Sequence, residues 1–115
     1  MSIIFSRYKL IIQYDGTKYL GWQLQKQGRT VQGTIENSLK KLSNRQSRII
    51  VHGSGRTDAG VHALAQVAHI DFKSTLNVQD IKNALNSNLP QDCRIIDIEQ
   101  VKSDFHSRFN AKKRY

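Results

Sequence analysis

Three glycines bracket an arginine and an aspartate in the stretch Gly53-Ser54-Gly55-Arg56-Thr57-Asp58-Ala59-Gly60-Val61-His62-Ala63. Apolar, β-branched residues precede this stretch at 49–51, and an apolar-rich segment follows it at 64–72. Both flanks are typical of β-strands, because they are rich in apolar residues and bounded by glycines. The sequence therefore predicts that Asp58 lies on a connection between two strands, where binding and catalytic residues often gather.

Two interpretations of this stretch remain open on its spacing alone. Glycine, serine and aspartate favour turns, so the stretch can be a simple connection between strands. Alternatively, the glycines permit positive φ angles or let another backbone or a ligand approach closely; these are Gly53, Gly55 and Gly60. Two glycine motifs are excluded, since no G-x-G-x-x-G spacing of a dinucleotide loop and no Gly-Lys pair of a P-loop occurs in the chain.

The chain is strongly basic. Its 115 residues carry 18 lysines and arginines against 9 aspartates and glutamates, for a formal net charge of +9. This excess predicts a polyanionic partner. Nucleic acid is the first choice and an anionic membrane the second, although no basic amphipathic helix supports a membrane partner. The alternative is that the basic residues only solvate the surface.

Length and composition indicate one domain with an ordinary core. No apolar run approaches the roughly 20 residues of a membrane helix, and the apolar start is too short for a secretory signal. We therefore expect no membrane association and a cytoplasmic location. Cys93 is alone and the four histidines lack metal-site spacing, so neither a disulfide nor a metal site is expected.

Hydrophobic periodicity predicts four strands. Alternate residues from Tyr8 to Tyr14 are apolar in a strand over 7–14, with Lys9 and Gln13 on its other face. The remaining strands are expected at 49–52, 64–72 and 94–102.

Apolar residues at helical spacing predict helices over 31–42 and 78–89. Thr30 and Asn77 are the expected amino-terminal caps, and Pro90 ends the second helix. Lys40 and Lys41 suit the dipole at the end of the first helix, with RNA contact as an alternative. The order of elements predicts an α+β, ferredoxin-like split βαβ fold. It has a four-stranded antiparallel sheet with two helices on one face and the other face open.

Five blocks of the sequence, in this order, resemble the tRNA pseudouridine synthase A family. The block GRTDAGVHA at 55–63 looks like the active-site motif of that family. YDGTKYLGWQLQ at 14–25 resembles the family's opening segment, and TVQGTIE at 30–36 resembles its first helix. LNSNLP at 85–90 resembles the end of its second helix, and FHSRFNA at 105–111 resembles the block before its pocket tyrosine. The resemblance covers nearly the whole chain.

The resemblance implies an enzyme that isomerises uridine to pseudouridine in the anticodon stem-loop of tRNA, without a metal or other cofactor. It implies Asp58 as the catalytic carboxylate, in the role of nucleophile. Because the uridine must leave its stack, Arg56 is expected to stack or to bind phosphate in its place. The alternative for Arg56 is an ion pair within its own domain. Thr57 is expected to contact RNA, and His62 to be structural.

Further RNA contacts are expected before and after this motif. Lys18 and Gln23 lie in the connection that the resemblance assigns to the RNA face. Trp22, in the same connection, either anchors the core or stacks on a base. In the tail, basic residues interleaved with aromatics suit an RNA path, so Arg108 and Tyr115 are also candidate RNA-binding residues.

The resemblance implies that members of the family contain two such domains in tandem. This chain resembles the first of them. The family's pocket tyrosine is expected just beyond Tyr115, and a basic residue near Asp58 is expected from the second domain. We therefore expect residues 1–115 to form the amino-terminal catalytic-aspartate domain, to catalyse poorly alone, and to form a homodimer through the uncovered sheet. The alternative function is a non-catalytic RNA-binding module, which would have little use for the negative charge of Asp58.

Overall fold

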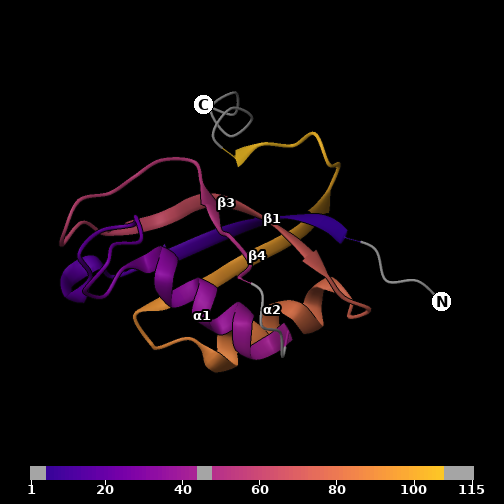
Figure 1. The fold of residues 1–115 in the computed structure, drawn as a ribbon, viewed down its shortest axis with the longest axis horizontal. Coiled ribbons are helices and arrows are strands. Elements are labelled where there is room, and N and C mark those ends of the chain that lie inside the picture. The colour runs from indigo at the N-terminus through magenta and orange to yellow at the C-terminus, as the bar shows by residue number, and fades with distance from the viewer. Residues whose placement is uncertain (1–4, 44–47, 108–115) are drawn as a thin grey trace.

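The structure, a computed structural model, describes residues 5–43 and 48–107. Within these residues a four-stranded antiparallel sheet carries two helices on one face (Figure 1). The elements in chain order are β1 (Phe5–Tyr14), the 3-10 turn η1 (Gly16–Lys18), α1 (Val31–Ser43), β2 (His52–Gly53), β3 (Ala63–Lys73), α2 (Val78–Asn88) and β4 (Cys93–Val101). The spatial order is β2-β3-β1-β4. This is the α+β, ferredoxin-like arrangement that the sequence predicts.

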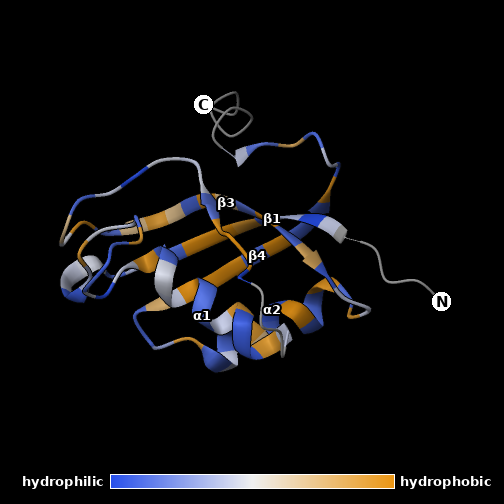
Figure 2. Ribbon diagram, in the orientation of Figure 1, coloured by the Kyte–Doolittle hydropathy of each residue, from blue (hydrophilic) through white to orange (hydrophobic). Residues whose placement is uncertain are grey.

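The core lies between the sheet and the two helices, where the apolar faces of strands and helices meet (Figure 2). Strand side chains alternate between faces, so every second residue of β1 enters this layer. Each large apolar side chain buried there contributes about 1.5–3 kcal/mol. The members of the core are Tyr8, Leu10, Ile12, Tyr14, Tyr19, Trp22, Val31, Ile35, Leu39, Val51, Ala68, Ile70, Phe72, Ile81, Leu85, Leu89, Cys93, Ile95 and Ile98.

Both helices begin at the predicted caps. The hydroxyl of Thr30 accepts a hydrogen bond from the N–H of Gly33 (3.2 Å). The side chain of Asn77 accepts one from the N–H of Asp80 (2.9 Å). These bonds satisfy N–H groups that have no partner inside the helix. The observed helices differ from the predicted spans by one residue at their ends.

β2 is shorter than the sequence predicts, because its first residues bond to a helix instead of a strand. The prediction of a strand over 49–52 is wrong for 49–51, since β2 begins only at His52. The N–H of Val51 donates to the carboxylate of Glu36 (3.0 Å), and its carbonyl accepts from the side chain of Gln32 (3.2 Å). Both partners lie on α1, so this stretch is fixed by the helix.

β4 contains one extra residue relative to β1. Ile11 is opposite Asp97, whereas the next residue, Ile12, is opposite Ile95. The extra residue, Ile96, marks a β-bulge, which bends a strand and increases its twist. Its side chain is 40% exposed.

The second face of the sheet is open only in part. Figure 1 shows the chain after β4, in yellow, returning on the side of the sheet away from the helices. Val67 and His69 of β3 alternate with core residues, yet they are only 5% and 2% exposed. Gln13 of β1 remains exposed. The predicted open face is therefore partly covered, because residues after β4 pack on it.

Candidate functional site

Asp58 lies on the connection between β2 and β3, as the sequence predicts. Its side chain is exposed, and among the described residues it forms no hydrogen bond or ion pair. Its carbonyl accepts from the N–H of Val61 (3.1 Å), which closes a turn. The backbone is thus fixed while the carboxylate remains accessible to a substrate.

The Asp58 loop is held by the connection between β1 and α1. The N–H of Trp22 donates to the carbonyl of Thr57 (3.0 Å). The N–H of Gly60 donates to the carbonyl of Tyr19 (3.2 Å). One bond lies on each side of Asp58, so the loop is positioned from both ends by a segment about 40 residues earlier in the chain.

Side chains add two further contacts between these segments. The hydroxyl groups of Tyr14 and Thr57 share a hydrogen bond of 2.8 Å. Burial raises the pKa of Tyr14, so its hydroxyl stays protonated at neutral pH. His62 accepts a hydrogen bond at Nδ1 from the N–H of Gly16 (2.9 Å). This contact agrees with a structural role for His62.

The close approach of the two segments requires glycine at Gly21 and Gly16. Gly21 has a φ of 98°, and a Cβ there would overlap the carbonyl oxygen of Thr57. A Cβ at Gly16 would overlap the carbonyl oxygen of Val61. A backbone oxygen cannot move aside as the end of a flexible side chain can. Any larger residue would therefore displace the Asp58 loop.

Of the three glycines in the motif, Gly60 alone has the positive φ that the sequence offers as one interpretation. Gly60 has a positive φ of 80°. The indole of Trp22 packs against Gly53, where a Cβ would lie 2.6 Å from the ring. Gly55 shows neither feature, since its φ is not positive and the space beside it is open. The close approach of a ligand at Gly55 therefore stays a prediction.

A charged cluster anchors the β1–α1 connection to the α2–β4 connection. Arg29 binds Asp92 through two nitrogen atoms (2.7 and 2.9 Å) and lies over the ring of Tyr19, 4.1 Å from its centroid. The hydroxyl of Tyr19 also donates to Asp92 (2.7 Å). The hydrogen bond from Arg29 lowers the pKa of Asp92, so this carboxylate stays charged at neutral pH.

An open groove of about 850 Å³ runs beside β2 and brings together three predicted site residues, Trp22, Gln23 and Arg56. We call it the β2 groove. Arg56 is exposed and forms no ion pair with the described residues, so the alternative of a structural ion pair is not observed there. Trp22 is 3% exposed, which confirms its interpretation as a core anchor. Base stacking by Trp22 stays a prediction.

The other predicted RNA-binding residues lie elsewhere. Lys18 lines a smaller hollow with Asp15 and residues 90–92, apart from Arg56. Thr57 is half-buried and bonded to Tyr14, which gives it a structural role in the loop. Arg108 and Tyr115 lie outside the described residues. Contact of any of these with RNA stays a prediction.

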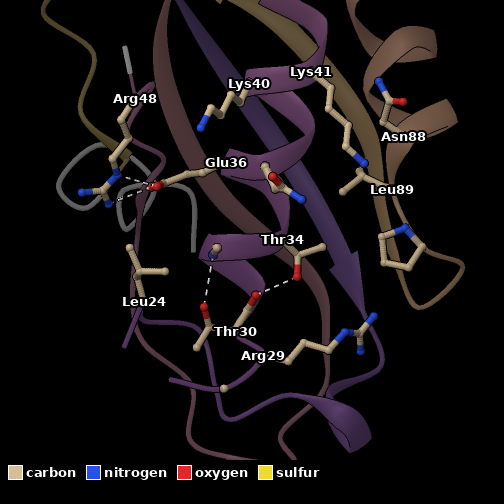
Figure 3. A pocket seen from close by; sticks show the side chains of 14 residues that line it. Leu24, Arg29, Thr30, Thr34, Glu36, Lys40, Lys41, Arg48, Asn88 and Leu89 are labelled. Carbon is tan, nitrogen blue, oxygen red and sulfur yellow. Dashed lines mark hydrogen bonds and ion pairs between the residues drawn. The ribbon is translucent and has the colours of Figure 1, made fainter. Parts of the chain in front are cut away.

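A second groove, of about 820 Å³, lies along α1 on the helix side of the molecule (Figure 3). We call it the α1 groove. Arg48 binds Glu36 (2.6 Å), and Arg29 binds Asp92, so two of its four cations have carboxylate partners. Lys40 and Lys41 form no ion pair with the described residues.

Sequence reasoning missed the contacts of Tyr14, Gly16 and Gly21 with the Asp58 loop, because they join segments far apart in the chain. It also missed the contact between His69 and Ser107, which is buried on the second face of the sheet. The sequence did carry one signal for these contacts. Gly16 and Gly21 lie five residues apart in a polar connection, in the block at 14–25, and this spacing indicates a close backbone approach.

Several observations limit the chemistry of the described residues. Within residues 5–43 and 48–107, no group of three His, Cys, Asp or Glu side chains is placed to share a metal ion. Neither α1 nor α2 combines the length and the apolar character that crossing a membrane requires. Cys93 is fully buried, and burial raises the pKa of its thiol to about 12, which makes it a poor nucleophile.

Comparisons with known proteins point in one direction. The sequence model of a family described as tRNA pseudouridine synthase matches residues 10–110. A protein named tRNA pseudouridine synthase A from Ligilactobacillus salivarius is 46% identical over 110 residues, which cover 95% of this chain and 43% of the relative. Proteins of the same name from Maridesulfovibrio salexigens and Rhodopseudomonas palustris are 52% and 51% identical, over 91% and 95% of this chain and 38% and 44% of the relatives. The chain therefore spans less than half the length of these relatives.

Proposed function

Because this chain belongs to the tRNA pseudouridine synthase family, we propose that the whole protein converts uridine to pseudouridine in the anticodon stem-loop of tRNA, with Asp58 as catalytic nucleophile. The observation that supports this role most directly is the state of Asp58. Its carboxylate is exposed and has no partner among the described residues, while its loop is fixed on both sides. A fixed backbone with a free carboxylate is what a positioned nucleophile requires.

The proposed reaction is an isomerisation in which the uracil stays in the site. The bond from ribose C1′ to uracil N1 breaks, the ring turns, and C1′ bonds to C5, which loses its proton while N1 gains one. The carboxylate of Asp58 acts beside the ribose and the base. Arg56, in the β2 groove, stacks or binds phosphate where the uridine has left its neighbours. Gln23 lines the same groove and flanks the RNA, while Trp22 is buried beside it and would stack on a base only through the edge of its ring that lines the groove.

A non-catalytic RNA-binding module is the second candidate, and it would use the same groove and the same basic charge. Asp58 separates the two proposals. A carboxylate exposed beside Arg56 weakens binding to phosphates, and a binding module gains nothing from it. We favour the enzyme for this reason.

We also propose how the protein is divided into domains, how it assembles and where it acts. Residues 1–115 correspond to the amino-terminal domain of a two-domain protein, since the relatives are more than twice as long as the part they share with this chain. Alone, this domain catalyses poorly or not at all, because a second domain completes the pocket. It forms a homodimer and acts in the cytoplasm. Sedimentation that shows strictly monomeric protein at high concentration would contradict the homodimer.

The test is to incubate the full-length protein with unmodified tRNA and to map pseudouridine by chemical modification. Wild type is expected to modify the anticodon stem-loop, and Asp58→Ala is expected to modify nothing while it still binds tRNA. The matched control is Asp97→Ala, which removes an exposed carboxylate on β4. RNA binding without modification by wild type would favour the binding module.

A further inference from the structure

The segment formed by residues 105–107, which we call the crossing segment, is attached to the second face of the sheet. Arg7 of β1 donates a hydrogen bond to the carbonyl of Phe105 (2.6 Å). The same guanidinium binds both oxygens of Asp71 on β3 (2.8 Å each). Because Arg7 is fixed by this two-point ion pair, it holds the crossing segment at a defined place above β1 and β3.

The other end of the crossing segment is held by a buried histidine. The N–H of Ser107 donates to Nδ1 of His69 (3.2 Å), and the hydroxyl of Ser107 donates to the carbonyl of His52 (2.8 Å). His69 and Ser107 are 2% and 0% exposed. The rings of His52 and His69 stack with centroids 4.7 Å apart. One serine thus joins β2, β3 and the crossing segment.

His69 can accept this hydrogen bond because it is neutral. Burial, aided by the positive charge of Arg7, lowers the pKa of His69 to about 4. The titratable and charged groups around it come from every neighbouring element: Arg7 and Lys9 from β1, His52 from β2, Asp71 from β3 and His106 from the crossing segment. At neutral pH, the N–H of Ser107 selects the tautomer that is protonated at Nε2, so Nδ1 keeps the lone pair that accepts its hydrogen bond.

The crossing segment also forms part of the β2 groove. His106 lines this groove together with Arg56 and Trp22. Its ring lies against His69, with centroids 4.8 Å apart. His106 stands between the two attached residues of the crossing segment, so its position follows from theirs.

We propose that His69 and Ser107 are positioning residues for RNA binding: they fix the crossing segment on the sheet and thereby set the position of His106 in the β2 groove, which Arg56 also lines. This inference rests on the proposed function, because RNA is the ligand of the groove. Neither residue contacts the RNA itself, since both are buried. Their effect is transmitted through His106.

The experiment combines RNA affinity with amide hydrogen exchange on the full-length protein at neutral pH, using unmodified anticodon stem-loop RNA as the probe. His69→Phe keeps an aromatic ring but removes the acceptor, and we expect it to weaken binding about tenfold and to abolish protection of residues 105–107. His69→Asn places an oxygen near the position of Nδ1, and we expect it to restore both. Ser107→Ala is expected to lose affinity several-fold.

The control is Ser87→Ala, the same chemical change on α2, which is expected to alter neither measurement. RNA affinity equal to that of wild type in both His69→Phe and Ser107→Ala would overturn the proposal. An equal loss of affinity in His69→Asn and His69→Phe would also overturn it. If wild type itself binds no RNA, the proposed function fails too, whereas wild-type binding that these variants leave unchanged refutes the positioning role alone.

Discussion

The β2 groove and the α1 groove are of similar size, but their arginines differ in whether they are bound to a carboxylate. In the α1 groove, Arg48 and Arg29 are each bound to a carboxylate at 2.7 Å or less. In the β2 groove, Arg56 has no carboxylate partner among the described residues. An arginine already bound to a carboxylate has little to offer a phosphate, whereas an unpaired one remains available.

The difference shows that net charge alone does not locate a nucleic-acid surface. The excess of +9 indicates a polyanionic partner, yet part of the basic charge stabilises the fold. Glu36 shows this clearly, because it binds Arg48 and also the N–H of Val51. The β2 groove is also the one that adjoins the Asp58 motif, since Arg56 belongs to both.

The largest expected effect comes from a comparison of Gly21, which precedes Trp22 of the β2 groove, with Gly33, which lines the α1 groove. Gly21→Ala forces a side chain into a positive φ and against the carbonyl of Thr57, and we expect it to destabilise the protein by roughly 2–4 kcal/mol. In Gly33→Ala the new Cβ would press on the end of the Leu24 side chain and on the capping hydroxyl of Thr30, but no backbone atom lies in its way and alanine gains helix propensity, so we expect a smaller change of about 1 kcal/mol. Urea unfolding measures both. Equal destabilisation would show that the close approach at Gly21 is not required.

The β2 groove is also expected to respond to acid, because its wall depends on His69. The pKa of His69 is about 4 in the folded protein and about 6.5 when unfolded, so the unfolded chain binds the proton first as pH falls. Stability is therefore complete above about pH 6.5 and falls between there and about pH 4, by roughly 2–3 kcal/mol. Urea unfolding across this range should show the slope in wild type. If the free energy of unfolding of His69→Asn falls just as steeply with pH, the pH dependence comes from other groups.

The two arginines are expected to give opposite results. Arg56→Ala should weaken RNA binding about tenfold and reduce the slope of log affinity against log salt by about one. Arg48→Ala should leave RNA affinity within about twofold but lower stability by about 1 kcal/mol, because Glu36 loses a partner. Affinity titrations at several salt concentrations, with urea unfolding, check both variants. A larger loss of affinity in Arg48→Ala would reverse the assignment of the grooves.

The smallest effect is expected at the unpaired cations of the α1 groove. Replacing Lys40 and Lys41 together by glutamine should change RNA affinity by less than about threefold, since favourable placement at a helix end accounts for both lysines. The same affinity titration measures this change. A tenfold loss would make the α1 groove a second RNA contact, which is the alternative that the sequence leaves open.

The sequence predicts the elements of this fold well and their mutual contacts poorly. Alternation in β1 and helical spacing in α1 are local patterns, so they identify the core faces correctly. The start of β2 depends on where Glu36 and Gln32 bond, which no local pattern contains. The motif around Asp58 is recognisable in sequence. Its attachment to Gly21 and the role of His69 are not, because they arise from contacts between distant segments.

The short β2 and the bulge in β4 have a consequence for how copies of the protein meet. An outer strand with free N–H and C=O groups is a template for fibrous aggregation. Here one outer strand has only two residues, and the residue before it is already bonded to α1. The other outer strand is interrupted at Ile96 and carries Arg94 and Glu99. The two outer strands of this sheet are therefore poor templates for strand-by-strand pairing.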